Sequence, residues 1–368
     1  MRKIVTIAGA RPQFIKAAMV SRALQDHYPR ITEVFVHTGQ HSDFLMSGIF
    51  FDQLGLKEPS HHLSISGGSN SAQVARMMAA LEPVVRTENP DAILVYGDTN
   101  STLAGALIAS QLTIPLIHVE AGMRSFNRRM PEEINRVITD QLSTLLFAPT
   151  NTAVRNLVRE GMGNDGPVKQ NIIRTGDIMY DAALHFGASA SRPDSLPSGI
   201  NAASGYILCT VHRPVNADDP ERLRSIVAAL HALCENTGLS VVFPVHPRTR
   251  LQLSATQDEN STHIRFCEPF GYTDMLWLEQ HASLIITDSG GVQKEAYFFR
   301  KPCVILRNET EWTELTDSGA AVLSGSDDNE LLSACEKMLT LNKSDWPQLF
   351  GDGNTAHLIA SSIDQLLA

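Results

Sequence analysis

The chain has 368 residues, a formal net charge of -10, 43% hydrophobic residues and 19% charged residues. This length exceeds one typical hydrophobic core, so we expect two domains of an ordinary globular protein. The negative charge and the lack of a basic stretch argue against a general nucleic-acid binder, and no apolar segment is long enough to span a bilayer.

The cysteine and histidine patterns exclude two further classes of protein. The five cysteines are scattered without a Cys-x-x-Cys pair, and no His/Cys cluster has the spacing of metal ligands. We therefore expect neither a disulfide framework nor a metal site. The first apolar run is too short for a secretory signal, which predicts a cytoplasmic protein.

Short apolar runs alternate with longer amphipathic segments along the whole chain. Strands are expected at residues 4–8, 33–37, 92–96, 116–119 and 144–148, and then at 206–210, 240–244, 263–266, 284–287 and 303–306. Helical spacing of apolar residues is found at 14–24, 71–85, 101–111 and 220–233. Continuous apolar strands that alternate with helices are typical of buried parallel sheets.

The sequence therefore predicts an α/β fold with two doubly wound, Rossmann-like domains that face a cleft. We place the N-terminal domain at 1–172 and the C-terminal domain at 173–353, and we expect a final helix at 354–368 to complete the first domain. Ligands of doubly wound sheets bind at the carboxyl ends of the strands. Polar residues just after the strands are therefore the candidates for a functional site.

Two cations follow the first expected strand. Arg11 and Lys16 could both reach a phosphate above the sheet. A surface arginine and lysine beside a helix that starts with proline would look the same.

Carboxylates follow the next strands of the first domain. Asp98 either caps the following helix or is a cleft carboxylate. Glu120 ends a buried strand, and Glu132 and Glu133 open a helix, where the helix dipole alone could explain them. Three carboxylates at one sheet edge would raise one another's pKa and would suit acid–base chemistry near neutral pH.

In the second domain, a Ser-Gly-Gly turn at 289–291 joins strand 284–287 to a helix. Glycines allow a close approach of a ligand, and the free N–H groups of a helix start favour a phosphate. Glu295, one turn later, could accept hydrogen bonds from ribose hydroxyls. An ordinary strand-to-helix turn is the alternative.

Two His/Arg pairs follow the preceding strands of this domain. They are His212 with Arg213 and His246 with Arg248. A single histidine is more often structural, but two such pairs at successive strand ends favour anion binding.

Together these motifs resemble the non-hydrolysing UDP-N-acetylglucosamine 2-epimerase family over nearly the whole chain. The motifs that carry the resemblance are Gly-Asp-Thr at 97–99, His-Val-Glu-Ala-Gly at 118–122, Pro-Glu-Glu-Ile-Asn-Arg at 131–136, Val-His-Arg at 211–213 and Thr-Asp-Ser-Gly-Gly at 287–291. The resemblance implies a GT-B-type fold, UDP held mainly by the second domain, a homodimer and no cofactor.

The resemblance also implies a reaction at C2 of a UDP-sugar. A base removes the C2 proton while UDP leaves by anti elimination, a 2-acetamidoglucal forms, and UDP then adds back. The catalytic residues implied are Asp98, Glu120, Glu132 and His212. The substrate-binding residues implied are Arg11, Lys16 and Arg136 in the cleft, Ser289, Gly290 and Gly291 at the diphosphate, and Glu295 at the ribose.

The exact sugar stays open. UDP-N-acetylglucosamine is the primary expectation, because the family is named for it. Departures from the common family pattern at 39–42, 69–70 and Trp312 resemble instead the branch that acts on UDP-2,3-diacetamido-2,3-dideoxy-glucuronate for surface polysaccharide synthesis. Those at 39–42 and 69–70 also put an activating UDP-sugar site in doubt.

Arg124, Arg128 and Arg129 could meet the C6 carboxylate of such a uronate, although a solvated loop explains them equally well. A hydrolysing epimerase, a GT-B glycosyltransferase and a nucleotide-sugar sensor without turnover are the alternative functions.

Overall fold

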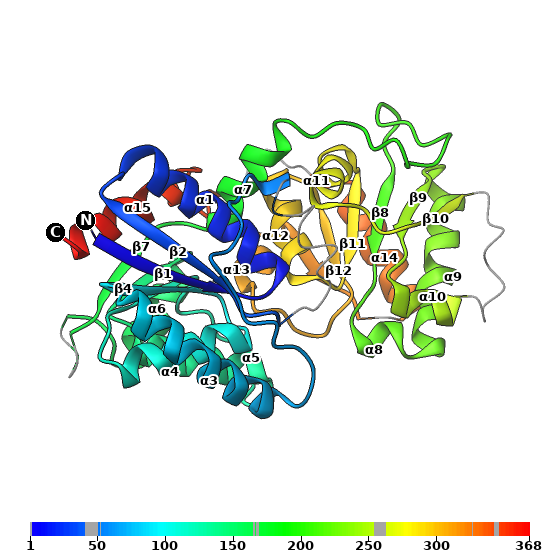
Figure 1. Ribbon diagram of the computed structural model, residues 1–368. Helices are drawn as coiled ribbons and strands as arrows, with labels where there is room; N and C mark the ends of the chain where they lie inside the picture. The colour runs from blue at the N-terminus through cyan, green and yellow to red at the C-terminus, as the bar shows by residue number, and fades with distance from the viewer. Residues whose placement is uncertain are drawn as a thin grey trace. The chain divides into compact units, whose positions relative to one another are not determined.

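The computed structural model describes residues 2–40, 51, 53–164, 166, 169–253, 263–325, 327–341 and 346–368, without the side chains of 247, 248 and 251. The chain divides into two compact units (Figure 1). The first unit comprises Met1–Ala182 and Gln348–Ala368, and the second comprises Ala183–Pro347.

The first unit is built on a seven-stranded parallel sheet in the order β3-β2-β1-β4-β5-β6-β7. Its strands are β1 (Arg2–Ala8), β2 (Ile31–His37), β3 (His61–His62), β4 (Ala92–Tyr96), β5 (Leu116–Val119), β6 (Leu145–Ala148) and β7 (Asn171–Arg174). Every residue of β4 is buried, as expected for an apolar strand covered on both faces. The strand order reverses between β1 and β4, the place where doubly wound sheets bind ligands.

Helices cover both faces of this sheet (Figure 1). On one face lie α1 (Arg11–His27) and α15 (Thr355–Leu366), and on the other lie α3 (Asn70–Glu88), α4 (Asn100–Gln111) and α5 (Pro131–Leu142). The first unit also contains α6 (Asn151–Arg159), and α7 (Ile178–Gly187) crosses the boundary between the units. Helix α15 packs against α1, and Arg30 pairs with Asp364.

The contacts divide the chain after residue 182 rather than after the expected residue 172. A boundary at 172 would cut β7, which pairs with β6 along its whole length. Strand β7 has no fully buried residue, so its sequence lacks the apolar run that marks the central strands.

The second unit contains a six-stranded parallel sheet in the order β10-β9-β8-β11-β12-β13. Its strands are β8 (Ile207–Thr210), β9 (Val241–Pro244), β10 (Ile264–Cys267), β11 (Leu284–Thr287), β12 (Cys303–Ile305) and β13 (Ala321–Leu323). Its helices are α8 (Pro214–Ala217), α9 (Pro220–Thr237), α10 (Pro247–Leu253), α11 (Tyr272–His281), α12 (Gly290–Phe298), α13 (Thr313–Asp317) and α14 (Asp328–Leu339). Apolar residues of α9 and α14 form one buried core with β8, β9 and β11. The prediction of two Rossmann-like α/β domains is confirmed.

Glu279 on α11 is a buried carboxylate whose replacement should stabilise the second unit. Its side chain is fully buried, and neither oxygen has a hydrogen-bond partner among the described residues. Burial, and then the charge of Glu295, raises the pKa of Glu279 well above its ordinary value. We expect Glu279→Met to raise the free energy of unfolding by about 1–3 kcal/mol near neutral pH, because it removes an unpaired polar group and keeps the volume filled.

The stability gained by Glu279→Met should increase with pH. Because the folded-state pKa lies above the unfolded-state value of about 4.3, wild-type stability falls as the pH rises above that value. The gain from Glu279→Met should therefore grow as the pH rises above about 4.3. Urea unfolding followed by tryptophan fluorescence reports on the second unit, because all three tryptophans lie in it. The exposed Glu235→Met is the matched control, and a gain independent of pH would contradict the assignment.

Candidate functional site

The carboxyl end of β1 enters α1 through a tight turn at Gly9. A Cβ there would lie 2.0 Å from Thr38 Oγ1 and 2.3 Å from Ser101 Oγ, so only glycine fits. The turn presents Arg11 as the first residue of α1, where it is exposed, and Lys16 in the second turn, where it is buried. The two cations expected after the first strand therefore have different surroundings.

Lys16 and Glu120 form a direct ion pair, and both side chains are largely buried. Glu120 follows β5 with a φ of +74°, a left-handed conformation that is strained for a residue with a side chain. A Cβ on Gly97 would lie 3.2 Å from Glu120 Oε2 and 3.4 Å from Lys16 Nζ. The glycine after β4 thus leaves room for this pair against the backbone.

Asp98 pairs with Arg136 of α5. Its Oδ2 lies 2.6 Å from Nη2 and 2.9 Å from Nε of the guanidinium. Thr99, not Asp98, caps α4 by accepting a hydrogen bond from the N–H of Thr102, so the interpretation of Asp98 as a cap is wrong.

Each of the two carboxylates that follow strands has a cation as a partner. Asp98 has Arg136 as its partner, and Glu120 has Lys16. The expectation that neighbouring carboxylates raise one another's pKa stays a prediction.

The two glutamates that open α5 differ in their roles. Glu133 is buried and accepts hydrogen bonds from Ser125 N (2.8 Å), Ser125 Oγ (2.9 Å) and Phe126 N (3.0 Å). Burial by itself raises the pKa of Glu133, but these donors and the charge of Arg136 lower it overall. Glu133 thus holds the preceding loop, whereas Glu132 is exposed at the helix start.

Arg124 is not available to a substrate. Its guanidinium donates to both oxygens of Glu160 and to Asp140 Oδ2, at 2.7–2.8 Å, and its side chain is 1% exposed. Arg128 and Arg129, in the same loop before α5, are exposed. The expectation that Arg124 meets a sugar carboxylate is therefore wrong, and only the two later arginines keep that option.

Two of the positions that depart from the common family pattern, Ser69 and Asn70, have structural roles. Ser69 caps α3, and Asn70 Oδ1 accepts a hydrogen bond from Asn100 Nδ2 at 3.1 Å. His41 and Ser42 lie outside the described residues.

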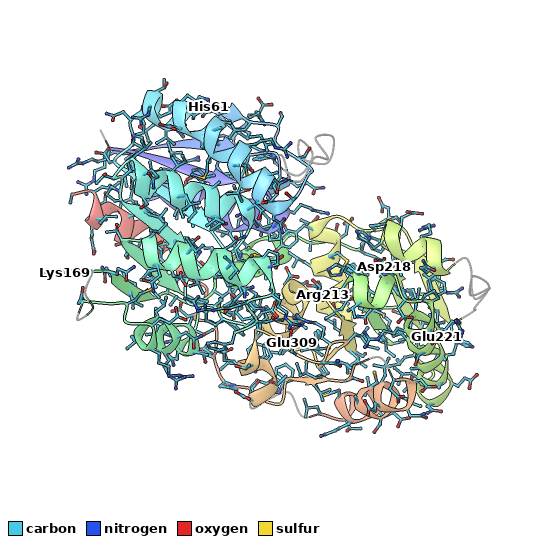
Figure 2. All side chains as sticks on the ribbon, turned by 90° about the horizontal axis from the view of Figure 1, so that it is seen from below. His61, Lys169, Arg213, Asp218, Glu221 and Glu309 are labelled. Carbon is cyan, nitrogen blue, oxygen red and sulfur yellow. The ribbon has the colours of Figure 1, made fainter. Side chains whose placement is uncertain are left out.

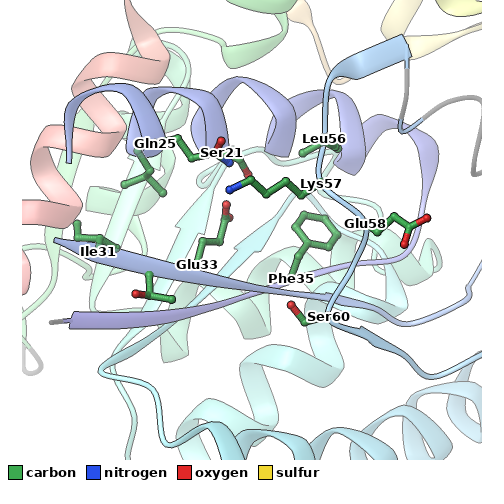
Figure 3. A pocket seen from close by; sticks show the side chains of 11 residues that line it. Ser21, Gln25, Ile31, Glu33, Phe35, Leu56, Lys57, Glu58 and Ser60 are labelled. Carbon is green, nitrogen blue, oxygen red and sulfur yellow. The ribbon is translucent and has the colours of Figure 1, made fainter. Parts of the chain in front are cut away.

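A cavity of about 220 Å³ lies between α1, β2 and the segment 56–60 (Figure 3). Glu33 and Lys57 point into it, and Thr6 Oγ1 donates to the carboxylate of Glu33. The cavity borders the first half of β2, whereas the candidate residues follow the carboxyl ends of β1, β4 and β5. It is therefore separate from the candidate site.

In the second unit, Asp288 orients His212. The carboxylate is fully buried, and its Oδ1 lies 2.9 Å from His212 Nδ1. It also accepts hydrogen bonds from the backbone N–H of Arg213 (3.0 Å) and from Asn216 Nδ2 (3.1 Å). Burial by itself raises the pKa of Asp288, but the hydrogen bond and charge of His212 lower it below its ordinary value.

Because Nδ1 of His212 faces Asp288, Nε2 lies on the opposite side of the half-exposed ring. The sequence interpretation assigned no role to Asp288, although it lies within the Thr-Asp-Ser-Gly-Gly motif. The signal was an acidic residue directly after a fully buried strand.

The histidines that follow β8 and β9 lie near each other, as the two His/Arg pairs suggested. The ring centroids of His212 and His246 are 6.3 Å apart. Arg213 is the N-cap residue of α8 (Figure 2), and the side chain of Arg248 lies outside the described residues.

The Ser-Gly-Gly turn forms the start of α12. Ser289 caps the helix, its Oγ accepting from the N–H of Val292. A Cβ on Gly291 would lie 4.0 Å from Glu295 Oε2, so this carboxylate borders the first turn. The arrangement suits a phosphate at the helix start and a hydroxyl-bearing group beside it.

Charged and aromatic side chains surround this helix start. A Cβ on Gly290 would lie 3.1 Å from Glu311 Oε1, and Glu311 pairs with Arg307 at 2.9 Å. Lys294 Nζ lies 4.1 Å from the ring centroid of Trp312. At Trp312, where the sequence departs from the common family pattern, the aromatic ring thus packs against the buried Lys294.

Each unit thus carries part of the candidate set, at the carboxyl ends of its own strands. Among the side chains that the structure describes, no group of three or more His, Cys, Asp or Glu residues could hold a metal ion. No helix within the described ranges has the length and apolar character to cross a membrane. The homodimer stays a prediction.

Comparisons with known proteins agree with these motifs. A family model described as UDP-N-acetylglucosamine 2-epimerase matches residues 22–364. The UDP-2,3-diacetamido-2,3-dideoxy-D-glucuronate 2-epimerase of Pseudomonas aeruginosa is 47% identical over 364 residues, covering 99% of this chain and 100% of the relative.

Solved structures agree as well. The UDP-N-acetylglucosamine 2-epimerase of Methanocaldococcus jannaschii, in complex with UDP-N-acetylglucosamine and UDP, has a TM-score of 0.86 at 38% identity and covers 99% of both chains. A spinosyn rhamnosyltransferase, with a TM-score of 0.56 at 14% identity over 99% of this chain and 96% of its own, shares the fold alone. The predicted GT-B-type fold is confirmed.

Proposed function

The chain belongs to the UDP-N-acetylglucosamine 2-epimerase family and is a UDP-sugar 2-epimerase, and on that premise we propose that its substrate is UDP-2,3-diacetamido-2,3-dideoxy-D-glucuronate. The observation that carries this proposal is the 47% identity, over the full length, to a relative named for that activity. It replaces our primary expectation of UDP-N-acetylglucosamine.

We propose that the first unit supplies the proton transfers at C2. Inverting C2 requires a base on one face of the carbon and an acid on the other, so more than one carboxylate is needed. Asp98, Glu120 and Glu132 are assigned to this task, and the cation partners of Asp98 and Glu120 support it. Lys16 beside Glu120 favours the carboxylate form that a base requires.

The second unit is assigned to the leaving group. The N–H groups at Ser289, Gly290 and Gly291 would bind the diphosphate, and Glu295 the ribose. His212, oriented by Asp288, would stabilise the negative charge that develops on UDP as it departs. Arg11 is assigned to the same charge from the first unit.

The uronate carries a C6 carboxylate that the plain sugar lacks. Arginine suits a carboxylate because its planar fork can donate two parallel hydrogen bonds. Arg128 and Arg129 are exposed on the loop between Glu120 and Glu132. We assign the recognition of this carboxylate to the two arginines.

UDP-N-acetylglucosamine is the second candidate substrate. The M. jannaschii enzyme, 38% identical over 99% of both chains, has this sugar in its name and in its complex. The chemistry at C2 would be the same.

One experiment compares the two sugars. Each is incubated with the enzyme in deuterated water and followed by proton NMR. We expect the uronate to epimerise with deuterium entering at C2, at a kcat/KM at least about 100-fold above that of UDP-N-acetylglucosamine. A preference for UDP-N-acetylglucosamine would overturn the substrate assignment. Stoichiometric free UDP would instead indicate a hydrolysing epimerase or a transferase.

A double variant tests whether Arg128 and Arg129 determine the preference for the uronate. Replacing Arg128 and Arg129 together by glutamine should raise KM for the uronate about 10-fold or more and leave KM for the neutral sugar within about twofold. Arg155→Gln, at an exposed position of α6 in the same unit, is the matched control. An equal effect on both sugars would remove these arginines from substrate recognition.

A further inference from the structure

A buried row of charged side chains lies beneath the loops that follow β4 and β5. His118 of β5 and Asp140 of α5 have no exposed side-chain surface, and Arg124 is 1% exposed. Glu160, the exposed C-cap residue of α6, ends the row at the surface. Nothing in the proposed chemistry uses these four residues.

The partners of His118 define its protonation. Its Nε2 lies 2.8 Å from the carbonyl oxygen of Gly97, and its Nδ1 lies 2.7 Å from Asp140 Oδ1. A carbonyl oxygen can only accept, so Nε2 must carry a proton. Asp140 Oδ2 accepts from Gly122 N (3.1 Å) and Arg124 Nη1 (2.7 Å), and the charge of the adjacent guanidinium favours the carboxylate form of Asp140. Nδ1 faces this carboxylate, and only an imidazolium can donate to the carbonyl and to the carboxylate together.

Charges alternate along the row, which makes their burial possible. Arg124 Nε and Nη2 donate to Glu160 at 2.8 and 2.7 Å, so the order is His118, Asp140, Arg124 and Glu160. Burial by itself raises the pKa of Asp140, but the hydrogen bond from His118 and the charges of His118 and Arg124 lower it overall. Buried ions are stable only with such partners.

The row holds the loop of Asp98 through Gly97. The N–H of Gly97 donates to Val119 O at 2.9 Å, and its carbonyl accepts from His118. Both polar groups of this glycine are thus bound to β5, and Asp98 is the next residue. Across Gly97 lies the pair of Lys16 and Glu120.

The row also holds the loop of Glu120. Asp140 accepts from the N–H of Gly122, two residues after Glu120. Arg136, one turn before Asp140 on α5, pairs with Asp98. One face of α5 therefore fixes the loops of both carboxylates.

We propose that the His118 imidazolium is a positioning residue that sets the placement of Asp98 relative to Glu120 for proton transfer at C2. This proposal rests on the function proposed above. A neutral ring could donate to Gly97 or to Asp140, but not to both. It would lose either the bond to Gly97 or the bond that orients Asp140, the acceptor of Gly122 N–H. A shift of about 1 Å at a reacting group costs about 100-fold in rate.

The protonation state is tested without reference to activity. In enzyme labelled with ¹⁵N-histidine, both ring nitrogens of His118 should show the shifts of protonated nitrogen near about pH 7. His118→Gln or Asp140→Asn assigns the resonance. An unprotonated nitrogen in His118 would overturn the proposal. An enzyme that is inactive on every UDP-sugar would refute the proposed function and leave this measurement valid.

The positioning role is tested by kinetics. His118→Gln should lower kcat and the rate of deuterium entry at C2 about 100-fold, with KM within about threefold. Asp140→Asn should likewise lower kcat and leave KM nearly unchanged. A merely structural role would lower stability and leave kcat of the folded variant unchanged, which would overturn the proposal.

His61→Gln is the matched control. His61 Nε2 pairs with Glu88 at 2.8 Å in the same unit, at the edge strand β3. This pair contacts neither loop, so kcat should stay within about twofold. An equal loss of kcat in both histidine variants would also overturn the assignment of His118.

Discussion

Replacing Asp98 by asparagine is expected to abolish epimerisation while UDP binding survives. General acid–base catalysis by one side chain contributes about 10²–10⁴-fold, so kcat should fall by that range. The amide keeps the shape of the carboxylate but cannot take a proton. The UDP-binding residues assigned to the second unit are untouched, so the affinity for UDP should change by less than about threefold.

The measurement combines two readouts and one control. Deuterium entry at C2 reports the proton transfer, and calorimetric titration reports the UDP affinity. Asp91→Asn is the control, because Asp91 precedes β4 and bonds the N–H of Lys3, whereas Asp98 follows β4. A variant at Asp98 that retains more than about a tenth of wild-type kcat would remove it from the catalytic set.

Replacing Asp288 by asparagine should destabilise the second unit by about 3 kcal/mol. The carboxylate is fully buried and accepts from the backbone N–H groups of His212 and Arg213 and from Asn216. An amide nitrogen placed among these donors leaves at least one of them without an acceptor. The ring of His212 would also lose its fixed orientation, so kcat should fall as well.

The effect should depend on pH in a sense opposite to that of Glu279. The folded-state pKa of Asp288 is depressed, so its contribution is present above the unfolded-state value of about 3.9 and is lost as the pH falls through the folded-state value. Wild type and variant should therefore converge in stability at low pH.

Tryptophan fluorescence during urea unfolding again reports this unit. Asp327→Asn is the control, since Asp327 caps α14 from an exposed position and asparagine caps equally well. If both variants lose the same stability, the role assigned to Asp288 is refuted.

Local patterns predicted the central strands well. β4 and β11 are continuous apolar runs, and both are fully buried in the structure. Three strands were not expected from the sequence: β3, β7 and β13. Each has two to four residues and lies at the edge of its sheet, where one side has no strand to cover it and the apolar signal is weak.

The partners of the site residues could not be predicted in the same way. Lys16 and Glu120 are 104 residues apart, and Arg136 and Asp98 are 38 apart. Glu132 and Glu133 are neighbours with the same chemistry, and only the position of the loop at 125–126 makes one of them structural. Such contacts depend on which helix face meets which strand end.

By itself, the sequence determined the α/β class, the doubly wound order of elements, the family and the polar residues at the strand ends. Those features follow from local periodicity and turn chemistry, which act within one element. Only the tertiary structure showed that Arg124 forms ion pairs with Glu160 and Asp140. It also showed that Asp288 is the partner of His212. The physical reason is that burial and charge pairing bring together side chains from separate elements, and these determine which carboxylates and cations remain for a substrate.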